Sequence, residues 1–207
     1  ISSNTSMQII GISGRSGSGK TSLIREIRNN FSISDVCILS LDNYYRNRED
    51  QEKDELGYYN FDLITSFEWD RVVADIKQLM SGLVLRQKQY VFNNEEQAAI
   101  LTYHPAQVLI IEGIFVLAEP RIWDLLDYSI IIDADINICR SRRLARDVKE
   151  RNYDRKEILH RFDNHVLPSF QSLIEPLKSK VDEVLINEGK LDKVRKILIE
   201  RVMTFLT

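Results

Sequence analysis

The chain has 207 residues, of which 43% are hydrophobic and 29% charged, a composition typical of a globular domain with an ample core. Its formal net charge of −3 at pH 7 argues against a surface for general binding to nucleic acid or to an anionic membrane. The longest apolar run, VLIIEGIFVLA, is too short to span a bilayer and contains Glu112. We therefore expect one domain over residues 1–207, cytoplasmic, with a small-molecule substrate and no nucleic-acid or membrane partner.

The first sixth of the chain contains a phosphate-binding pattern. Residues 1–6 show no periodicity, and we expect them to be disordered or foreign to the fold. The apolar run over residues 8–13 predicts a buried strand, and residues 14–21 then read GRSGSGKT, which matches the P-loop pattern between a strand and a helix. The alternative, a glycine-rich turn without a ligand, would not require Lys20 and Thr21 at its end.

This loop is predicted to bind the phosphates of a nucleotide. Its glycines allow backbone N–H groups to face the phosphates, and the helix that starts here adds the positive end of its dipole. Lys20 is expected to reach the β- and γ-phosphates, and the hydroxyl of Thr21 to bind Mg²⁺. The predicted cofactors are ATP or GTP and Mg²⁺, and the predicted nucleotide-binding residues are Gly14, Arg15, Ser16, Gly17, Ser18, Gly19, Lys20, Thr21 and Ser22.

A second apolar run, over residues 36–41, predicts another buried strand, and Asp42 follows it. A carboxylate at the end of that strand, next to the P-loop, can accept the proton of an incoming hydroxyl and direct its oxygen at the γ-phosphorus. Phosphoryl transfer depends on positioning more than on a strong base, so an ordinary carboxylate suffices. The alternative is an aspartate that caps a turn or a helix.

The middle of the chain predicts a helix and then an insertion. Residues 83–104 interrupt the alternation of strands and helices, and they predict a β-hairpin with a polar turn near Asn93 and Asn94. The helix before them is predicted from apolar residues at helical spacing: Trp69, Val72, Val73, Ile76 and Met80.

Glu112 ends the third predicted strand, over residues 108–113, after the apolar residues VLII. Its carboxylate is expected to project from the sheet beside the P-loop, where a carboxylate normally holds Mg²⁺ directly or through water. The alternative is a charge that only ends a strand. The predicted metal-binding set is Thr21, Glu112 and Asp42.

Residues 140–161 are basic, with nine Lys or Arg against four Asp or Glu. Arg142, Arg143 and Arg146 would form one guanidinium cluster on a helix. Such a cluster can neutralise charge on the transferred group and exclude water when the segment closes, so we predict a lid over these residues. The alternative is pairing with Asp147 and Glu150, which we expect for Arg142 more than for the other two.

The last third predicts two more strands, over residues 128–134 and 183–187, and a final helix. Buried strands that alternate with amphipathic helices predict an α/β fold, a P-loop NTPase-type parallel sheet flanked by helices, with the small β-hairpin insertion and the helical lid added to it. Ligands bind such sheets at the carboxyl ends of the strands, where every motif above falls. The final helix is predicted from Leu191, Val194, Leu198, Val202 and Phe205.

Six blocks together resemble the uridine kinase (uridine–cytidine kinase) family of P-loop kinases, in the family's order from Ile9 to the last helix: GISGRSGSGKTS, SLDNYY, YNFD, IIEGIFVL, DADINICRSRRLARDVKER and LPSFQSLIEP. The resemblance implies phosphorylation of the 5′-hydroxyl of a pyrimidine ribonucleoside, in pyrimidine salvage. It also implies an oligomer, often a tetramer, although no residue here indicates an interface.

The resemblance assigns roles to individual residues. Asp42 matches the catalytic aspartate, and Asp62 matches the acid that binds the ribose 2′- and 3′-hydroxyls. Arg143 and Arg146 match lid arginines that act with Lys20 on the phosphates. The residues matching the nucleoside site are Tyr45, Tyr90, Phe92 and, at the position of a histidine that reads the pyrimidine, Glu95.

Two segments depart from the family pattern. The insertion reads YVFNNEEQ, so Val91, Glu95 and Gln97 replace the usual Asp, His and Arg. An ionised glutamate only accepts hydrogen bonds, so Glu95 could suit the amine of cytosine better than a carbonyl of uracil; the alternative is a solvated turn. In the lid, Tyr153 stands where the family commonly has an arginine, a charge that Arg155 or Arg161 could supply.

The remaining chemical groups are expected to be structural. Cys37 and Cys139 lie in apolar contexts and are predicted to be buried, reduced thiols. His104, His160 and His165 are expected to be surface or packing residues, since a spacing of five does not place His160 and His165 on one helix face.

The sequence thus predicts an enzyme, a phosphotransferase acting on the alcohol group of uridine or cytidine. Two alternatives stay open: a kinase of the same fold for another nucleoside or a sugar phosphate, and a nucleotide-binding regulator without acceptor chemistry. Asp42 beside the aromatic NYY and the dedicated insertion argue against the regulator. The preference between ATP and GTP, the oligomeric state and feedback inhibition are not determined by the sequence.

Overall fold

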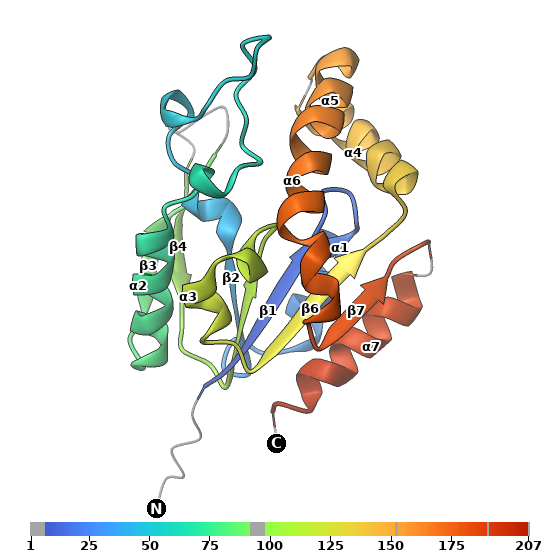
Figure 1. The fold of residues 1–207 in the computed structure, drawn as a ribbon. Helices are drawn as coiled ribbons and strands as arrows, with labels where there is room; N and C mark the ends of the chain where they lie inside the picture. The colour runs from blue at the N-terminus through green and yellow to red at the C-terminus, as the bar shows by residue number, and fades with distance from the viewer. Residues whose placement is uncertain (1–6, 92–97, 152, 190, 207) are drawn as a thin grey trace, which may run out of the picture.

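The computed structural model describes residues 7–91, 98–151, 153–189 and 191–206, without the side chains of residues 150, 151 and 191. Among these residues, five parallel strands form a sheet of order β2-β5-β1-β6-β7 (Figure 1). All five predicted strands are confirmed, each within one residue of its expected bounds. They are β1 (Gln8–Gly14), β2 (Val36–Ser40), β5 (Val108–Glu112), β6 (Tyr128–Asp133) and β7 (Glu183–Ile186).

The central strands are apolar along their whole length because helices cover both faces of the sheet. Ile9 packs into the hydrophobic cluster on one face and Ile10 into the cluster on the other, and both are almost fully buried. Each such side chain contributes about 1.5–3 kcal/mol on burial. β1 lies in the middle, where Ile12 faces Glu112 of β5 on one side and Ile130 of β6 on the other.

Two layers of helices complete the predicted α/β fold (Figure 1). α1 (Lys20–Asn30) and α7 (Leu191–Met203) cover one face, and α2 (Trp69–Met80), α3 (Pro120–Trp123) and α6 (Leu167–Leu173) cover the other. The lid region consists of α4 (Ile136–Arg151), α5 (Arg155–Arg161) and the π-helix η6 (Phe162–Val166). Short 3-10 helices complete the chain: η1 (Leu41–Tyr44), η2 (Arg48–Asp50), η3 (Ile64–Ser66), η5 (Val116–Ala118) and η7 (Glu175–Ser179).

The prediction of the core is wrong for one residue. Met80 is 44% exposed, and Leu79 is buried in its place beside Ile76. α2 ends at Met80, so the last turn follows the spacing of three from Ile76 to Leu79 rather than the spacing of four. In the final helix Val194, Leu198 and Val202 are buried as predicted.

The expected hairpin is present as β3 (Leu85–Lys88) and β4 (Ile100–Tyr103), which pair antiparallel with Leu85 opposite Tyr103. Its predicted turn near Asn93 and Asn94 lies outside the described residues, as does the disordered or foreign segment expected at residues 1–6. In the described ranges, no helix combines the length and the apolar character needed to cross a bilayer.

Both cysteines are buried and unpaired, as predicted. Burial raises the pKa of each thiol to about 11, so neither Cys37 nor Cys139 is a thiolate near neutral pH. Cys139 instead packs with Phe162 and Val166, which attaches α4 to the π-helix.

Candidate active site

A cavity of about 620 Å³ lies at the carboxyl ends of the strands, between the P-loop, the loops after β2 and the lid helices. It brings together residues from segments that are far apart in the sequence. The predicted site residues that line it are Gly14, Arg15, Ser16, Gly17, Gly19, Lys20, Thr21, Ser22, Asp42, Tyr45, Asp62, Arg143 and Arg146. Ser18 and Glu112 are buried just outside it.

The P-loop requires glycine at two positions with left-handed backbone, Gly17 at φ +88° and Gly19 at φ +92°. A Cβ on Gly17 would overlap the carbonyl oxygen of Cys139, and one on Gly19 would overlap the side chain of Asn187. Asn187 also donates a hydrogen bond of 2.8 Å to the carbonyl of Ser18. This buried residue after β7 holds the loop in place, and sequence reasoning missed it because a lone asparagine carries no motif.

Replacing Gly17 with alanine is expected to weaken nucleotide binding by at least about tenfold, because the loop must move away from Cys139 and a left-handed alanine costs of order 1–3 kcal/mol. Gly82→Ala is the matched control, since Gly82 is also left-handed, at φ +80°, but has no atom within 4 Å of its would-be Cβ. Titration with a fluorescent nucleotide measures the effect. Equal affinities of the two variants would mean that the close approach to Cys139 does not shape the loop.

Lys20 forms a buried ion pair with Glu112, Nζ to Oε2. Burial by itself would lower the pKa of Lys20, but the charges of Glu112 and then Asp42 outweigh it and raise that pKa. Burial by itself would raise the pKa of Glu112, and the Lys20 charge and hydrogen bond outweigh it and lower that pKa. Both groups are therefore charged at neutral pH, and Glu112 lies beside the P-loop as predicted.

The side chain of Arg15 turns away from the loop's glycines. Its guanidinium stacks on the ring of Phe170 at 4.4 Å and lies 3.8 Å from Asp133 and 3.7 Å from Glu175. Lys178 joins the same network with a contact of 2.6 Å to Asp133. The side chain of Arg15 thus links the P-loop to α6. Only the backbone of Arg15 lies with the backbone of the other P-loop residues.

Asp42 follows β2, an edge strand that β5 separates from β1. It still lies beside the P-loop, as expected, because it lines the same cavity and its charge raises the pKa of Lys20. The capping alternative is wrong, because Ser40 is the N-cap of η1 and its hydroxyl accepts a hydrogen bond of 3.3 Å from the Asp42 N–H. The Asp42 carboxylate is exposed at the cavity.

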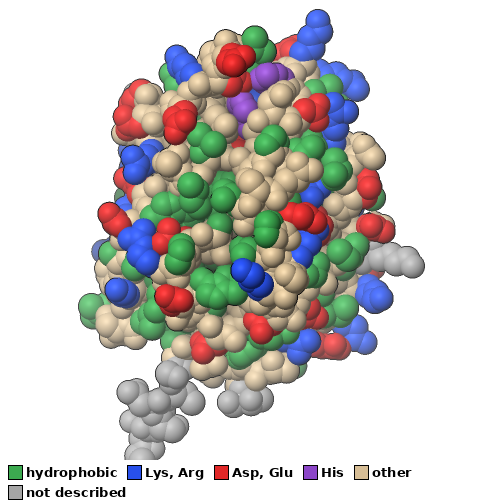
Figure 2. Space-filling view, in the orientation of Figure 1, with side chains coloured by type: hydrophobic (Ala, Val, Ile, Leu, Met, Phe, Trp, Pro, Cys, Tyr) green, Lys and Arg blue, Asp and Glu red, His purple; other side chains and the backbone are tan. Residues whose placement is uncertain are grey.

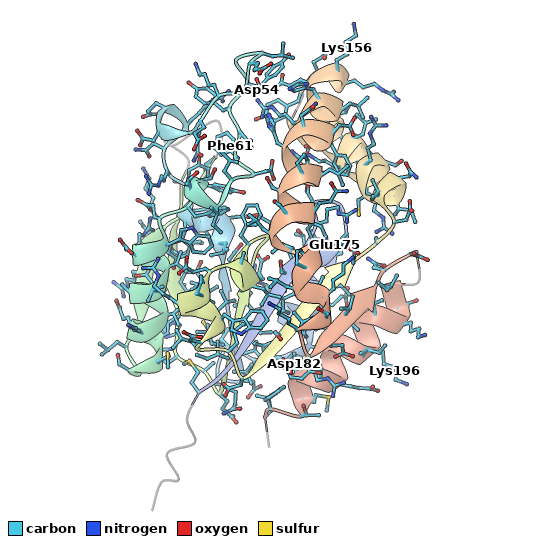
Figure 3. All side chains as sticks on the ribbon, viewed as in Figure 1. Asp54, Phe61, Lys156, Glu175, Asp182 and Lys196 are labelled. Carbon is cyan, nitrogen blue, oxygen red and sulfur yellow. The ribbon has the colours of Figure 1, made fainter. Side chains whose placement is uncertain are left out.

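Aromatic rings gather around the predicted nucleoside side of the cavity. Tyr45 contacts Phe61 edge-on at 5.6 Å and Tyr90 at 5.5 Å, and Asp62 lines the cavity beside them. Tyr90 itself is not part of the cavity lining. The predictions for Phe92 and Glu95 lie outside the described residues. Figure 3 labels Phe61 on the segment between η2 and α2.

The lid arginines pair differently from the expectation. Asp147 is almost fully buried and forms ion pairs with Arg146 at 2.7 Å and Arg143 at 3.3 Å, whereas Arg142 approaches the backbone carbonyls of Gly17 at 3.4 Å and Asn187 at 3.3 Å. The prediction that Arg142 would be the first to pair with Asp147 is therefore wrong. The spacing of four from Arg143 to Asp147 suits pairing on a helix, whereas the spacing of five from Arg142 does not, and Arg142 contacts the P-loop backbone instead.

Three further cations line the cavity: Arg25 on α1, Arg48 after β2 and Arg161 at the end of α5. Arg161 stacks on Tyr153 at 5.5 Å and forms an ion pair of 2.7 Å with Glu157. Arg161 therefore lies at the cavity, where it could supply the positive charge that is absent at Tyr153. Arg48 was missed because it sits in a charged stretch that reads as a solvated loop.

The expectation that His160 and His165 do not share a helix face is wrong. Both face the same carboxylate, that of Asp54, at 2.7 and 2.8 Å. The reason is η6, since a π-helical turn places residues five apart above one another, which an α-helix does not. His104 is exposed, as expected of a surface residue.

Comparison with known proteins agrees with this geometry. The profile described as "Phosphoribulokinase / Uridine kinase family" matches residues 9–194. A uridine kinase from Staphylococcus haemolyticus is 32% identical over 201 residues, covering 96% of this chain and 97% of the relative. A uridine kinase from Staphylococcus carnosus is 34% identical over 187 residues, covering 90% of this chain and 89% of the relative.

Solved structures share the fold. A structure described as a possible uridine kinase from Bacillus stearothermophilus aligns with a TM-score of 0.60 at 17% identity, covering 86% of this chain and 88% of that one. At this identity the likeness concerns the arrangement of helices and strands, and it confirms the predicted P-loop sheet with flanking helices.

Proposed function

Because the chain belongs to the phosphoribulokinase/uridine kinase family and is a phosphotransferase with an alcohol acceptor, we propose that it phosphorylates the 5′-hydroxyl of uridine or cytidine, the reaction of pyrimidine salvage. ATP or GTP is the proposed donor. The observation that carries the proposal is the single cavity that joins Lys20 and Thr21 of the P-loop, Asp42 and Asp62 after β2, and the lid arginines.

Asp42 is the proposed general base. The 5′-oxygen attacks the γ-phosphorus, the bond from that phosphorus to the β,γ-bridging oxygen breaks, and the proton of the hydroxyl passes to the Asp42 carboxylate. Asp62 is proposed to orient the ribose through its 2′- and 3′-hydroxyls. Tyr45 would pack with Tyr90 and Phe92 along the nucleoside.

Charge on the transferred group is proposed to be balanced from two sides. Lys20 stabilises it from the P-loop, and Arg143 and Arg146 from the lid, where Asp147 fixes the direction of both guanidiniums. Residues 140–161 would then act as the lid that excludes water, a competing acceptor. The hairpin over residues 83–104 is proposed to belong to the acceptor site.

The residues present fit a nucleotide and Mg²⁺. Gly17 and Gly19 have the left-handed backbone from which phosphate-binding loops are built, and Thr21 and Asp42 line the same cavity. Mg²⁺, held by Thr21, Asp42 and Glu112, would neutralise charge on the phosphates. Glu112 holds Lys20 in the structure, so one carboxylate serves both cations of the site.

Measuring ADP release with a panel of acceptors tests this proposal. Uridine and cytidine are expected to stimulate turnover, with cytidine preferred because Glu95 can only accept a hydrogen bond, as the cytosine amine requires. 5′-Deoxyuridine is the matched control: it keeps the base and the ribose diol, lacks the reacting hydroxyl, and is expected to inhibit without stimulating ADP release. No stimulation by any pyrimidine nucleoside would contradict the proposed acceptor.

A second acceptor class is favoured by one observation. Arg48 and Arg161 line the cavity, and Tyr153 replaces the arginine common in the family, so the positive charge around the acceptor is arranged differently. An acceptor with an anionic group, such as a sugar phosphate, would use these cations. Including sugar phosphates in the same panel of acceptors distinguishes a nucleoside acceptor from a sugar-phosphate acceptor.

A further inference from the structure

We propose that Asp54, His160 and His165 form a site for a divalent transition-metal ion of the zinc class, which joins the loop of the acceptor side to the lid helix. The three residues each offer one ligand atom, and these atoms lie within 4.8 Å of one another. Asp54 lies on the loop after η2, and the two histidines lie on α5 and η6, 106 and 111 residues further along the sequence. This site is separate from the P-loop chemistry, and the proposal does not rest on the proposed function.

The ligand atoms converge on one point. Nε2 of His160 and Nε2 of His165 both face Oδ2 of Asp54, at 2.7 and 2.8 Å. Ligand atoms of a tetrahedral zinc site stand about 3.3 Å apart, so binding requires each contact to widen by roughly 0.5 Å, a small side-chain adjustment. Two imidazole nitrogens and one carboxylate oxygen are a donor set that Zn²⁺ uses, with a fourth position left for water.

The groups behind the ligands are arranged as the supporting contacts of a metal site usually are. The other oxygen of Asp54, Oδ1, accepts hydrogen bonds of 2.9 Å from the N–H groups of Leu56 and Tyr58, which leaves Oδ2 directed at the histidines. Nδ2 of Asn164 donates a hydrogen bond of 2.9 Å to the carbonyl of His160 and lies 3.1 Å from Nδ1 of the same residue, so Asn164 contacts the imidazole on the side away from Asp54.

The backbone is bent to bring the two histidines together. The π-helix η6 inserts one residue into the helical run from α5 to α6, and without it His165 would point away from Asp54. The side chain of His165 is only 3% exposed, whereas those of Asp54 and His160 are 18% and 25% exposed, so an ion can enter from solvent. Such turns are frequently found at functional sites.

The place of the site gives the ion a structural role. Figure 3 labels Asp54 on the loop beside α5, and Figure 2 shows histidine side chains close to acidic ones near the top of this face. A bound ion would hold the loop that contains Asp54 against the helices that contain His160 and His165.

The test uses the whole chain without a histidine tag, stripped with a chelator and then titrated with ZnCl₂ in excess Mg²⁺. Calorimetry and elemental analysis after gel filtration are expected to give one zinc per chain. At a free zinc concentration 100-fold above Kd, the melting temperature should rise by about 5–10 °C. Both readouts are independent of catalytic activity.

Three variants assign the ion to these residues. His160→Ala and Asp54→Asn are expected to lower zinc affinity by more than about tenfold and to abolish the thermal shift, and Asp54→Asn does so while keeping the shape of the side chain. His104→Ala is the matched control, an exposed histidine elsewhere, and should bind zinc like the parent. Absence of zinc binding in the parent chain, or equal binding in all three variants, would overturn the proposal and leave the residues as a hydrogen-bonded contact.

Discussion

Replacing Asp42 with asparagine is expected to lower phosphoryl transfer by about 10²- to 10⁴-fold while nucleotide affinity stays within about threefold of the parent. The amide keeps the size of the carboxylate and its position in η1, but it cannot accept the proton of the acceptor hydroxyl. Because Asp42 contacts the cavity from β2 and not from the P-loop, the nucleotide-binding backbone should not change.

Single-turnover kinetics with saturating nucleotide and nucleoside measure this effect, and nucleotide titration checks binding. Asp50→Asn is the matched control, since it makes the same chemical change on an exposed residue in the same segment and outside the cavity lining. It should transfer phosphate at the parent rate. Near-normal turnover of Asp42→Asn would remove this carboxylate from the mechanism.

Replacing Lys20 with methionine is expected to weaken nucleotide binding and transfer together, and also to destabilise the nucleotide-free protein by about 3–5 kcal/mol. The second effect follows from the ion pair: the Lys20 and Glu112 side chains are 13% and 9% exposed, so removing the ammonium leaves a carboxylate charge buried without its partner. Methionine keeps most of the length and apolar stem of lysine, so the change tests charge more than packing.

A double-mutant cycle separates the two consequences of this change. In Lys20→Met with Glu112→Gln no unpaired charge remains, so urea denaturation should show that much of the lost stability returns, while nucleotide binding and transfer stay impaired. If the double variant is no more stable than Lys20→Met, the pair does not stabilise the nucleotide-free protein. If activity also returns, Lys20 is not needed at the phosphates.

These two predictions test different parts of the cavity, the donor side and the acceptor side. We expect the loss of Lys20 to affect every step that involves the nucleotide, and the loss of Asp42 to affect mainly the transfer to an acceptor. A nucleotide-binding protein without acceptor chemistry would lose function with Lys20 but would not respond to Asp42. The pair of variants therefore examines both the donor side and the acceptor side of the cavity.

The features that the sequence predicted are those set by neighbouring residues. Runs of β-branched residues determine where the five strands lie, and the P-loop pattern works because its glycines, lysine and threonine are held by one turn of backbone. The burial of Val194, Leu198 and Val202 follows from helical periodicity. Each of these features depends on geometry between residues that are close together in the sequence.

What the sequence left open depends on which segments pack together. In the sheet, β5 lies between β1 and β2. Asp42 therefore reaches the P-loop cavity across β5, an arrangement that cannot be read from the position of Asp42 in the sequence. Likewise Asp147 pairs with Arg143 and Arg146 because α4 packs on the P-loop and commits Arg142 to backbone carbonyls. Several arginines lie near Asp147 in the sequence, and the packing of distant segments determined which of them pair with it.

The sequence by itself determined that this chain has a P-loop sheet, a carboxylate after the second strand and a basic segment over residues 140–161, because each is a local pattern. Only the tertiary structure decided that Asp54 lies against His160 and His165. That contact needs a loop after β2 to meet the lid helix, and it needs a π-helical turn, whose hydrogen bonds span five residues and leave no clear periodicity to read. Chemistry that joins distant segments therefore appears only once the chain is folded.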